Sequence, residues 1–228
     1  GIVHRDLSPQ NVMVGYAGEV KLIDFGTARG HNRRCHTVAG VVFAKPGYVA
    51  PEVARQQVGD GRIDVYAMGV MLYELIVGRR PYVLSAAGDF AMMMAIARHD
   101  VRPPREVQPD VDPELEAIIQ RAMTYDPKGR YPTMLELQNA LEKFAEKRDL
   151  ELGSDALARY LEKLFGEKVD AWRTAQERED LAKHIVQVEE ERAQSGLYNE
   201  DSDGSATYIV DEISSVSSTT SRPGATPG

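Results

Sequence analysis

The sequence predicts a mainly α-helical domain with one small β-hairpin near its start, followed by a helical extension and a disordered tail. Between residues 65 and 147, several segments carry apolar residues at helical spacing. Two short apolar runs, 12–14 and 20–23, are separated by Gly15-Tyr16-Ala17-Gly18-Glu19, a stretch with two turn glycines that is typical of a β-hairpin. After residue 195 the chain is rich in Ser, Thr, Gly, Asp and Glu, and this composition cannot bury enough apolar surface to offset chain entropy.

Composition restricts the classes of protein that fit. The chain has 228 residues, of which 43% are hydrophobic and 27% charged, values that are ordinary for a soluble globular protein. The net charge of -8, from 27 Lys+Arg and 35 Asp+Glu, argues against nucleic acid as the main partner. Cys35 is the only cysteine, so no internal disulfide is possible and we expect a reducing compartment, the cytoplasm. No apolar run reaches the ~18 residues that span a bilayer, so we expect no membrane segment in these residues.

The helical segments are expected in a fixed order after the hairpin. A long functional loop comes first, because residues 26–49 lose all periodicity. The segment 65–76 is apolar nearly all round and ends at Gly78, which predicts a helix in the middle of the core. A proline-broken connection is expected at 101–113. The expected helices are 51–55, 65–76, 86–98, 113–124 and 133–147.

Past residue 147 the chain changes character. Ser154 and Asp155 are typical of a helix start, and Gly166 is expected to interrupt that helix. A longer charged helix is expected at 169–194, with a sparse apolar stripe. We therefore predict a domain, a helical extension and a disordered tail, with boundaries at 1–147, 148–195 and 196–228.

Three short stretches carry the candidate chemistry. The first is His4-Arg5-Asp6, with Asn11 five positions after Asp6; Asp24-Phe25-Gly26 and Ala50-Pro51-Glu52 follow. In this order and at these gaps they resemble the catalytic loop, the metal-binding turn and the end of the activation segment of a protein kinase. The resemblance covers residues 1–147 and implies a kinase C-terminal lobe. In this family the N-terminal lobe holds ATP, and we expect that lobe upstream of Gly1.

The resemblance implies a role for each matching residue. Asp6 would accept the proton of the substrate hydroxyl, and Asn11 and Asp24 would hold Mg²⁺ on the phosphates of ATP. Asp64 would hold the backbone of the catalytic loop, and Arg130 would pair with Glu52. The remaining motif residues, His4, Phe25 and Gly26, would be structural.

The resemblance also implies a regulatory site. Arg5 would pair with a phosphate on the activation loop. Thr37 is the candidate phosphorylation site, with Thr27 as a weaker one. The alternative is that neither threonine is modified and Arg5 only packs.

Two positions depart from the pattern of family members that act on Ser or Thr. Ser8 stands where they have Lys, and Lys45 stands where they have Thr. Our hypothesis is that Lys45 reaches the place of the missing lysine, with Ser8 as its hydroxyl partner. The alternative is that Ser8 marks lost activity and Lys45 is a solvated loop residue. The stretch from Ser8 to Asn11 resembles a variant in bacterial kinases of the eukaryotic-like type, notably the myxobacterial group.

The sequence therefore favours a bacterial protein serine/threonine kinase that acts in signal transduction, with ATP and Mg²⁺ as cofactors and proteins as substrates. Pro9 resembles the Ser/Thr pattern rather than the tyrosine-kinase one. A pseudokinase or truncated remnant that serves as a binding scaffold is the alternative, and the 228 residues alone are expected to bind Mg-ATP poorly.

Two weaker signals complete the candidates. Glu74 matches a family position that can contact basic residues of a substrate peptide, and it could equally cap or pack at a helix end. His31, Cys35 and His36 are interpreted as loop residues rather than metal ligands, because no second cluster with ligand spacing accompanies them.

Overall fold

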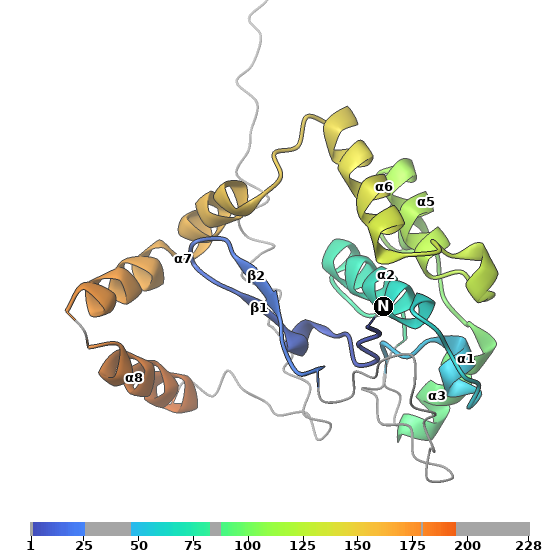
Figure 1. Ribbon diagram of the computed structural model, residues 1–228, viewed down its shortest axis with the longest axis horizontal. Coiled ribbons are helices and arrows are strands. Elements are labelled where there is room, and N and C mark those ends of the chain that lie inside the picture. Colours follow the sequence, from blue (N-terminus) through green and yellow to red (C-terminus); the bar gives the residue numbers. More distant parts are fainter. Residues whose placement is uncertain (1, 26–46, 83–87, 179, 195–228) are drawn as a thin grey trace, which may run out of the picture. The chain divides into compact units, whose positions relative to one another are not determined.

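The computed structural model describes residues 2–25, 47–82, 88–178 and 180–194. It divides into two compact units, Gly1–Leu164 and Phe165–Gly228. Within these described residues most of the secondary structure is helical, with one two-stranded sheet (Figure 1). The elements are β1 (Val12–Val14), β2 (Val20–Leu22), α1 (Pro51–Ala54), α2 (Arg62–Val77), α3 (Gly88–Arg98), α4 (Pro104–Val107), α5 (Pro113–Ala122), α6 (Met134–Lys147), α7 (Ser154–Glu177) and α8 (Leu181–Gln194).

The predicted β-hairpin is confirmed. β1 and β2 pair antiparallel, with Val12 opposite Leu22 and Val14 opposite Val20. In the turn between them, the Gly15 N–H donates to the Glu19 carbonyl at 2.9 Å, and the Gly15 carbonyl accepts from the Gly18 N–H at 2.8 Å. Gly18 has φ 79°, a left-handed conformation that favours glycine. The register brings the chain before β1 and the chain after β2 to the same end of the hairpin.

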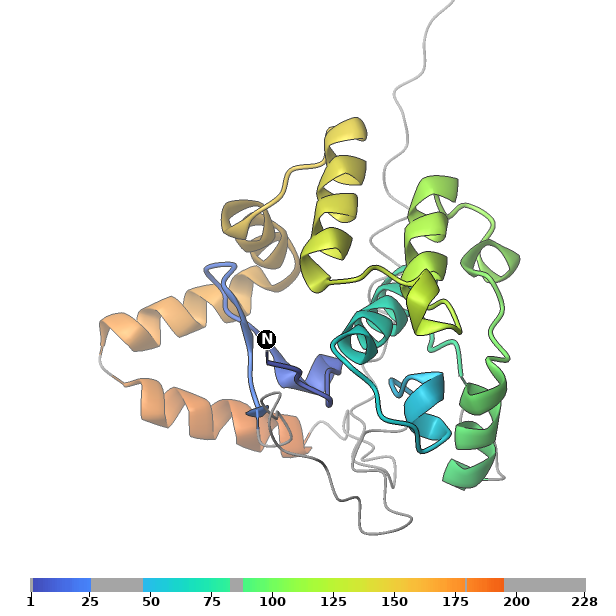
Figure 2. The same cartoon turned by 45° about the vertical axis from the view of Figure 1, so that its right-hand side comes forward.

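Helix α2 is the centre of the first unit, as its sequence predicts. Tyr66 and Val70 are fully buried, and buried residues occur on every side of the helix. It packs against α4, α5 and α6, and Figures 1 and 2 show it next to the α5–α6 pair. The helix ends at Gly78, whose φ of 76° lets its N–H donate to the Glu74 carbonyl at 2.8 Å.

Helices α5 and α6 begin at side-chain caps. The Asp112 carboxylate accepts from the Glu114 N–H at 2.8 Å, and the Thr133 hydroxyl accepts from the Glu136 N–H at 3.2 Å. Each helix then turns one apolar face inward. The buried residues that pack together between α2, α5 and α6 are Val65, Ile118, Ala122, Tyr131, Leu137 and Phe144.

Several expected boundaries are corrected. The connection at 101–113 contains the short helix α4, which Pro104 can start because proline is tolerated in the first helical turn. The helical break expected at Gly166 falls on Phe165, whose φ of −130° and ψ of 28° are not helical. The prediction of one helix over 169–194 is wrong, because α7 ends at Glu177 and α8 begins at Leu181. Asp180, which directly precedes α8, is a residue type favoured at a helix start.

None of the helices that the structure describes is both long enough and apolar enough to cross a bilayer.

Candidate active site

The backbone of the first candidate stretch is anchored on the central helix. Asp64, in the first turn of α2, accepts the His4 N–H at 2.7 Å with one carboxylate oxygen and the Arg5 N–H at 2.9 Å with the other. Arg5 has φ 72°, which is strained for a residue with a Cβ, and the two hydrogen bonds hold it there. Burial raises the pKa of Asp64, and the two N–H donors oppose that rise. The backbone on which Asp6 stands is thus fixed by a residue about 60 positions away.

A short turn brings Asn11 back over Asp6. Pro9, with its fixed φ, starts a single 3₁₀ turn that ends at Asn11. The Asn11 side-chain amide donates to the Asp6 backbone carbonyl at 2.7 Å and to an Asp6 carboxylate oxygen at 3.1 Å. Because the amide nitrogen faces Asp6, the amide oxygen is directed to the opposite side, where it can bind a metal ion.

The hairpin brings Asp24 to the same end as Asn11. The Ile23 N–H donates to the Asn11 carbonyl at 2.9 Å, which extends the strand pairing to the residue before Asp24. His4 fastens this end: its Nδ1 accepts from the Asp6 N–H at 3.3 Å, so its Nε2 donates to the Ile23 carbonyl at 3.0 Å. The His4 ring also lies 4.9 Å from the Phe25 ring. Asp24 is exposed and has φ 58°, a strained conformation of the kind that concentrates at functional sites.

The donor set suits magnesium. Mg²⁺ takes oxygen ligands and is usually bound through one or two carboxylates together with substrate phosphates, rather than by a cage of protein groups alone. Asn11 and Asp24 offer an amide oxygen and a carboxylate from neighbouring strand ends. Among the described residues there is no cluster of three or more His, Cys, Asp or Glu side chains that could hold a metal without a substrate. The Asn11 amide oxygen and the Asp24 carboxylate are therefore ligand types that fit part of the coordination shell of Mg²⁺.

The ion pair between Glu52 and Arg130 is present in the interior. Two parallel hydrogen bonds of 2.7 Å join the guanidinium to the carboxylate, and both side chains are buried. The pair fixes α1 to the segment that leads into α6.

Ser8 lies inside the protein rather than at its surface. Its side chain is 0% exposed, and its hydroxyl has no hydrogen-bond partner among the residues that the structure describes. A buried hydroxyl without a partner costs on the order of 1–3 kcal/mol. The serine that departs from the family pattern thus also carries a buried hydroxyl without a hydrogen-bond partner among the described residues.

One contact of a candidate residue was missed from the sequence. The Tyr48 hydroxyl donates to the Glu74 carboxylate at 2.5 Å, and burial together with this carboxylate raises the pKa of Tyr48. Glu74 is half-buried and joins the last turns of α2 to the chain that leads into α1. The sequence offered Glu74 as a candidate, but it gave no signal that Tyr48 lies against it.

Other candidates fall outside the described residues. They are Gly26, Thr27, His31, Cys35, His36, Thr37 and Lys45.

The model of the protein kinase domain matches residues 1–141, more than half of the chain, so the chain belongs to the protein kinase family. Among curated proteins it is 42% identical over 167 residues to the tyrosine-protein kinase MasK of Myxococcus xanthus strain DK1622, a match that covers 73% of this chain and 26% of MasK. It is 38% identical over 152 residues to the serine/threonine-protein kinase Pkn1 of Myxococcus xanthus, covering 62% of this chain and 21% of Pkn1.

A third relative lies outside the myxobacteria. The serine/threonine-protein kinase PknB of Mycolicibacterium smegmatis is 36% identical over 150 residues, covering 64% of this chain and 23% of PknB. The chain thus spans about a quarter of the length of these relatives. The MasK match is long enough that it must run past residue 160, beyond the end of the family model.

Proposed function

We propose that these residues form the C-terminal lobe of a protein serine/threonine kinase, which transfers the γ-phosphoryl group of ATP to hydroxyl groups of proteins. The observation that carries the proposal is the hydrogen-bonded pair of Asp6 and Asn11, held on the Asp64 carboxylate with Asp24 on the neighbouring strand end. A proton acceptor beside two oxygen donors is what phosphoryl transfer requires of the protein.

Each residue has a distinct part in this reaction. Asp6 orients the acceptor hydroxyl and takes up its proton as the oxygen attacks. Asn11 and Asp24 hold the metal ion through their side-chain oxygens. Bound Mg-ATP supplies the phosphoryl group and the cation that neutralises its charge. Asp64 acts through the backbone of His4 and Arg5, and it is therefore a positioning residue.

Serine and threonine are the proposed acceptors. Pro9 in the first stretch and the names of Pkn1 and PknB support them, whereas the name of MasK points to tyrosine. Phosphoamino-acid analysis of a general acceptor protein separates the two specificities.

The test is phosphate transfer from Mg-ATP by the full-length protein that carries these residues. Asp6→Asn should lower turnover by roughly 10²–10⁴, because the amide cannot accept the proton. Asp110→Asn, an exposed acid on the same domain, is the matched control and should keep normal turnover. The 228-residue polypeptide made without upstream residues should transfer phosphate at a negligible rate. Full activity in Asp6→Asn would refute the assignment.

Ser8 and Lys45 carry a second proposal about the same site. The supporting observation is the buried hydroxyl of Ser8, which has no partner among the described residues. We propose that the Lys45 ammonium is that partner and supplies the positive charge beside the transferred phosphoryl group.

Lys45→Ala should therefore lower turnover of the full-length protein by roughly 10²-fold, since a positive charge aimed at the transferred group is lost. Lys21→Ala, an exposed lysine on β2, is the control. Near-normal turnover in Lys45→Ala would rule out the exchange. If the unaltered full-length protein also fails to transfer phosphate, the pseudokinase alternative, for which the serine at position 8 speaks, would take its place.

A further inference from the structure

The β1–β2 hairpin carries the proposed metal ligands but has little core of its own. Both strands have only three residues, and their large side chains are partly or mainly exposed. An isolated two-stranded hairpin is marginally stable at best. One end of this hairpin is fixed by His4 and Asn11, so the position of the strands also depends on what holds the turn at the other end.

The turn lies against the first turns of α7. A Cβ added at Gly18 would come within 1.9 Å of the Ser154 carbonyl oxygen, 2.7 Å of the Ser154 carbonyl carbon and 2.9 Å of the Ala158 backbone nitrogen. All three are backbone atoms, which cannot move aside as the end of a side chain can. Gly18 thus meets two requirements at once, since it has a left-handed φ of 79° and the helix backbone approaches it too closely for any side chain.

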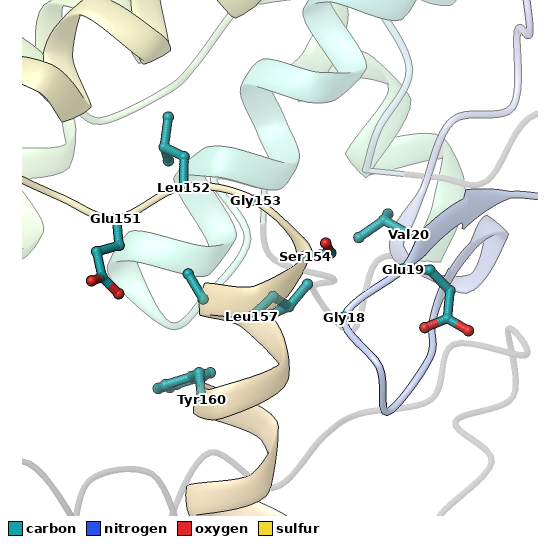
Figure 3. Close-up of a pocket in the computed structure, with 10 residues that line it drawn as sticks. Gly18, Glu19, Val20, Glu151, Leu152, Gly153, Ser154, Leu157 and Tyr160 are labelled. Atoms are coloured by element: carbon teal, nitrogen blue, oxygen red, sulfur yellow. The ribbon is translucent and has the colours of Figure 1, made fainter.

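The surroundings of this contact are mainly apolar. Figure 3 shows Leu157 and Ser154 extending from α7 toward the hairpin turn. An open cavity of about 700 Å³ lies beside the contact and is lined by both segments. Its apolar lining includes Val20, Leu152, Ala156, Leu157 and Tyr160. Both segments belong to the first compact unit.

The contact joins the family domain to a segment outside it. The kinase model ends at residue 141, whereas the first half of α7 is Ser154–Leu164. These residues nevertheless fall in the same compact unit as the hairpin. The helical extension therefore begins with a part that packs on the domain, and its helical conformation is then interrupted at Phe165.

We propose that the first half of α7 docks on the hairpin turn and holds the strands that carry Asn11 and Asp24, with Gly18 as a positioning residue. The docking contact stands independently of any reaction. Its effect on the metal ligands rests on the function proposed above.

Hydrogen exchange in the full-length protein tests the docking. In Gly18→Asn, asparagine tolerates the positive φ but its Cβ strikes the α7 backbone. Leu157→Ala weakens the contact from the α7 side. Each change should speed amide exchange in both 15–22 and 154–164 by about tenfold or more, because release of the contact exposes both segments. Lys163→Ala, an exposed lysine on the same helix, is the control and should leave both segments unchanged.

A double variant separates docking from general destabilisation. The free energy of local opening is obtained from the exchange rates. If Gly18→Asn and Leu157→Ala act through one contact, the double variant should change this free energy by less than the sum of the two single changes. If Gly18→Asn does not fold, Leu157→Ala alone carries the test. Unchanged exchange in the hairpin of Leu157→Ala would overturn the proposal.

Kinetics test the positioning role. Both variants should raise the KM for Mg-ATP by roughly tenfold, as is typical when support for a metal ligand is lost, and leave the KM for the acceptor protein unchanged. Faster exchange with an unaltered KM for Mg-ATP would refute the positioning role. If the unaltered protein transfers no phosphate at all, the proposed function fails, while the exchange experiment still decides whether α7 docks.

Discussion

At the scale of single residues, Arg130 shows how a buried charge is tolerated. Each of its five N–H groups has an acceptor: two on Glu52 and one each on the carbonyls of Thr124, Arg62 and Tyr125. The guanidinium also lies 4.8 Å from the centre of the Tyr66 ring. Burial of a charge removes its hydration, and hydrogen-bond partners must replace the lost water contacts to offset that cost.

Removal of one partner should therefore be costly. We expect Arg130→Ala to lower the free energy of unfolding by about 3–5 kcal/mol, because the Glu52 carboxylate is left buried without its counter-charge. Arg148→Ala removes an exposed arginine that pairs with Asp112, and it should cost no more than about 1 kcal/mol. Chemical denaturation of the purified chain measures both. Equal midpoints for Arg130→Ala and the unaltered chain would contradict the expectation.

At the scale of elements, the packing of α2 on α5 depends on one glycine. Gly69 lies inside α2, where glycine is less favourable than alanine by roughly 0.5–1 kcal/mol. A Cβ at this position would lie 2.7 Å from the Met123 Cγ and 2.9 Å from the Ala122 Cβ. The Ala122 Cβ cannot rotate away, so the glycine permits the two helices to come this close.

Gly69→Ala is therefore expected to destabilise the domain even though alanine is the better helix former. Overpacking of a close interface costs about 1–3 kcal/mol, which exceeds the gain in helix propensity. Gly166→Ala in α7 is the matched control, because nothing lies within 4 Å of the added Cβ. Its substitution should leave the thermal midpoint of the domain unchanged or slightly higher. A higher midpoint for Gly69→Ala would show that α5 moves aside easily.

At the scale of the whole molecule, a series of polar side-chain contacts extends from the Glu52–Arg130 pair to the end of α3. The Tyr66 ring lies against Arg130, and the Tyr66 hydroxyl is 2.8 Å from that of Tyr82. The Tyr82 hydroxyl in turn lies 3.4 Å from the His99 Nδ1. Burial raises the pKa of Tyr82 to about 12, so its hydroxyl stays neutral. Helices α1, α2 and α3 are thus linked by polar contacts as well as by apolar packing.

The partly buried His99 at the end of this series of contacts predicts that the stability of the protein depends on pH. Burial, with a smaller contribution from the charge of Arg130, lowers the pKa of His99 below its usual value near 6.5. Below about pH 6.5 the unfolded chain binds a proton at His99 that the folded protein does not. The free energy of unfolding therefore decreases as the pH is lowered, until the pKa of His99 in the folded protein is reached. The slope from this group is at most about 1.4 kcal/mol per pH unit.

Denaturation of the unaltered chain and of His99→Asn between pH 7.5 and about 5 measures this contribution. Asparagine tolerates the φ of 57° at this position, which limits strain in the variant. The variant should lose less stability on acidification than the unaltered chain. Parallel curves for the two proteins would show that His99 does not contribute.

Much of the local structure follows from the sequence because its causes are local. Two glycines in the five-residue turn predict the hairpin, an apolar surface on all sides predicts the burial of α2, and Gly78 predicts its end. The extension was less predictable. Phe165 leaves the helical conformation although nothing in its residue type requires this, and the sparse apolar stripe of 169–194 concealed the gap before α8.

The candidate site divides in the same way. The types and gaps of Asp6, Asn11 and Asp24 predict a site for phosphoryl transfer, because few residue types can supply a proton acceptor beside two hard-metal ligands. Sequence does not reveal that Tyr48 bonds Glu74, since that contact depends on where two separate segments meet.

The sequence by itself determined the family, the hairpin, the central helix and the residues suited to the chemistry, because residue type and spacing act over short distances. Only the tertiary structure decided that Ser8 is buried without a described partner, that every donor of Arg130 is used, and that the start of α7 lies against Gly18. The physical reason is that burial and close approach depend on segments up to about 140 positions apart in the chain, which no local pattern records.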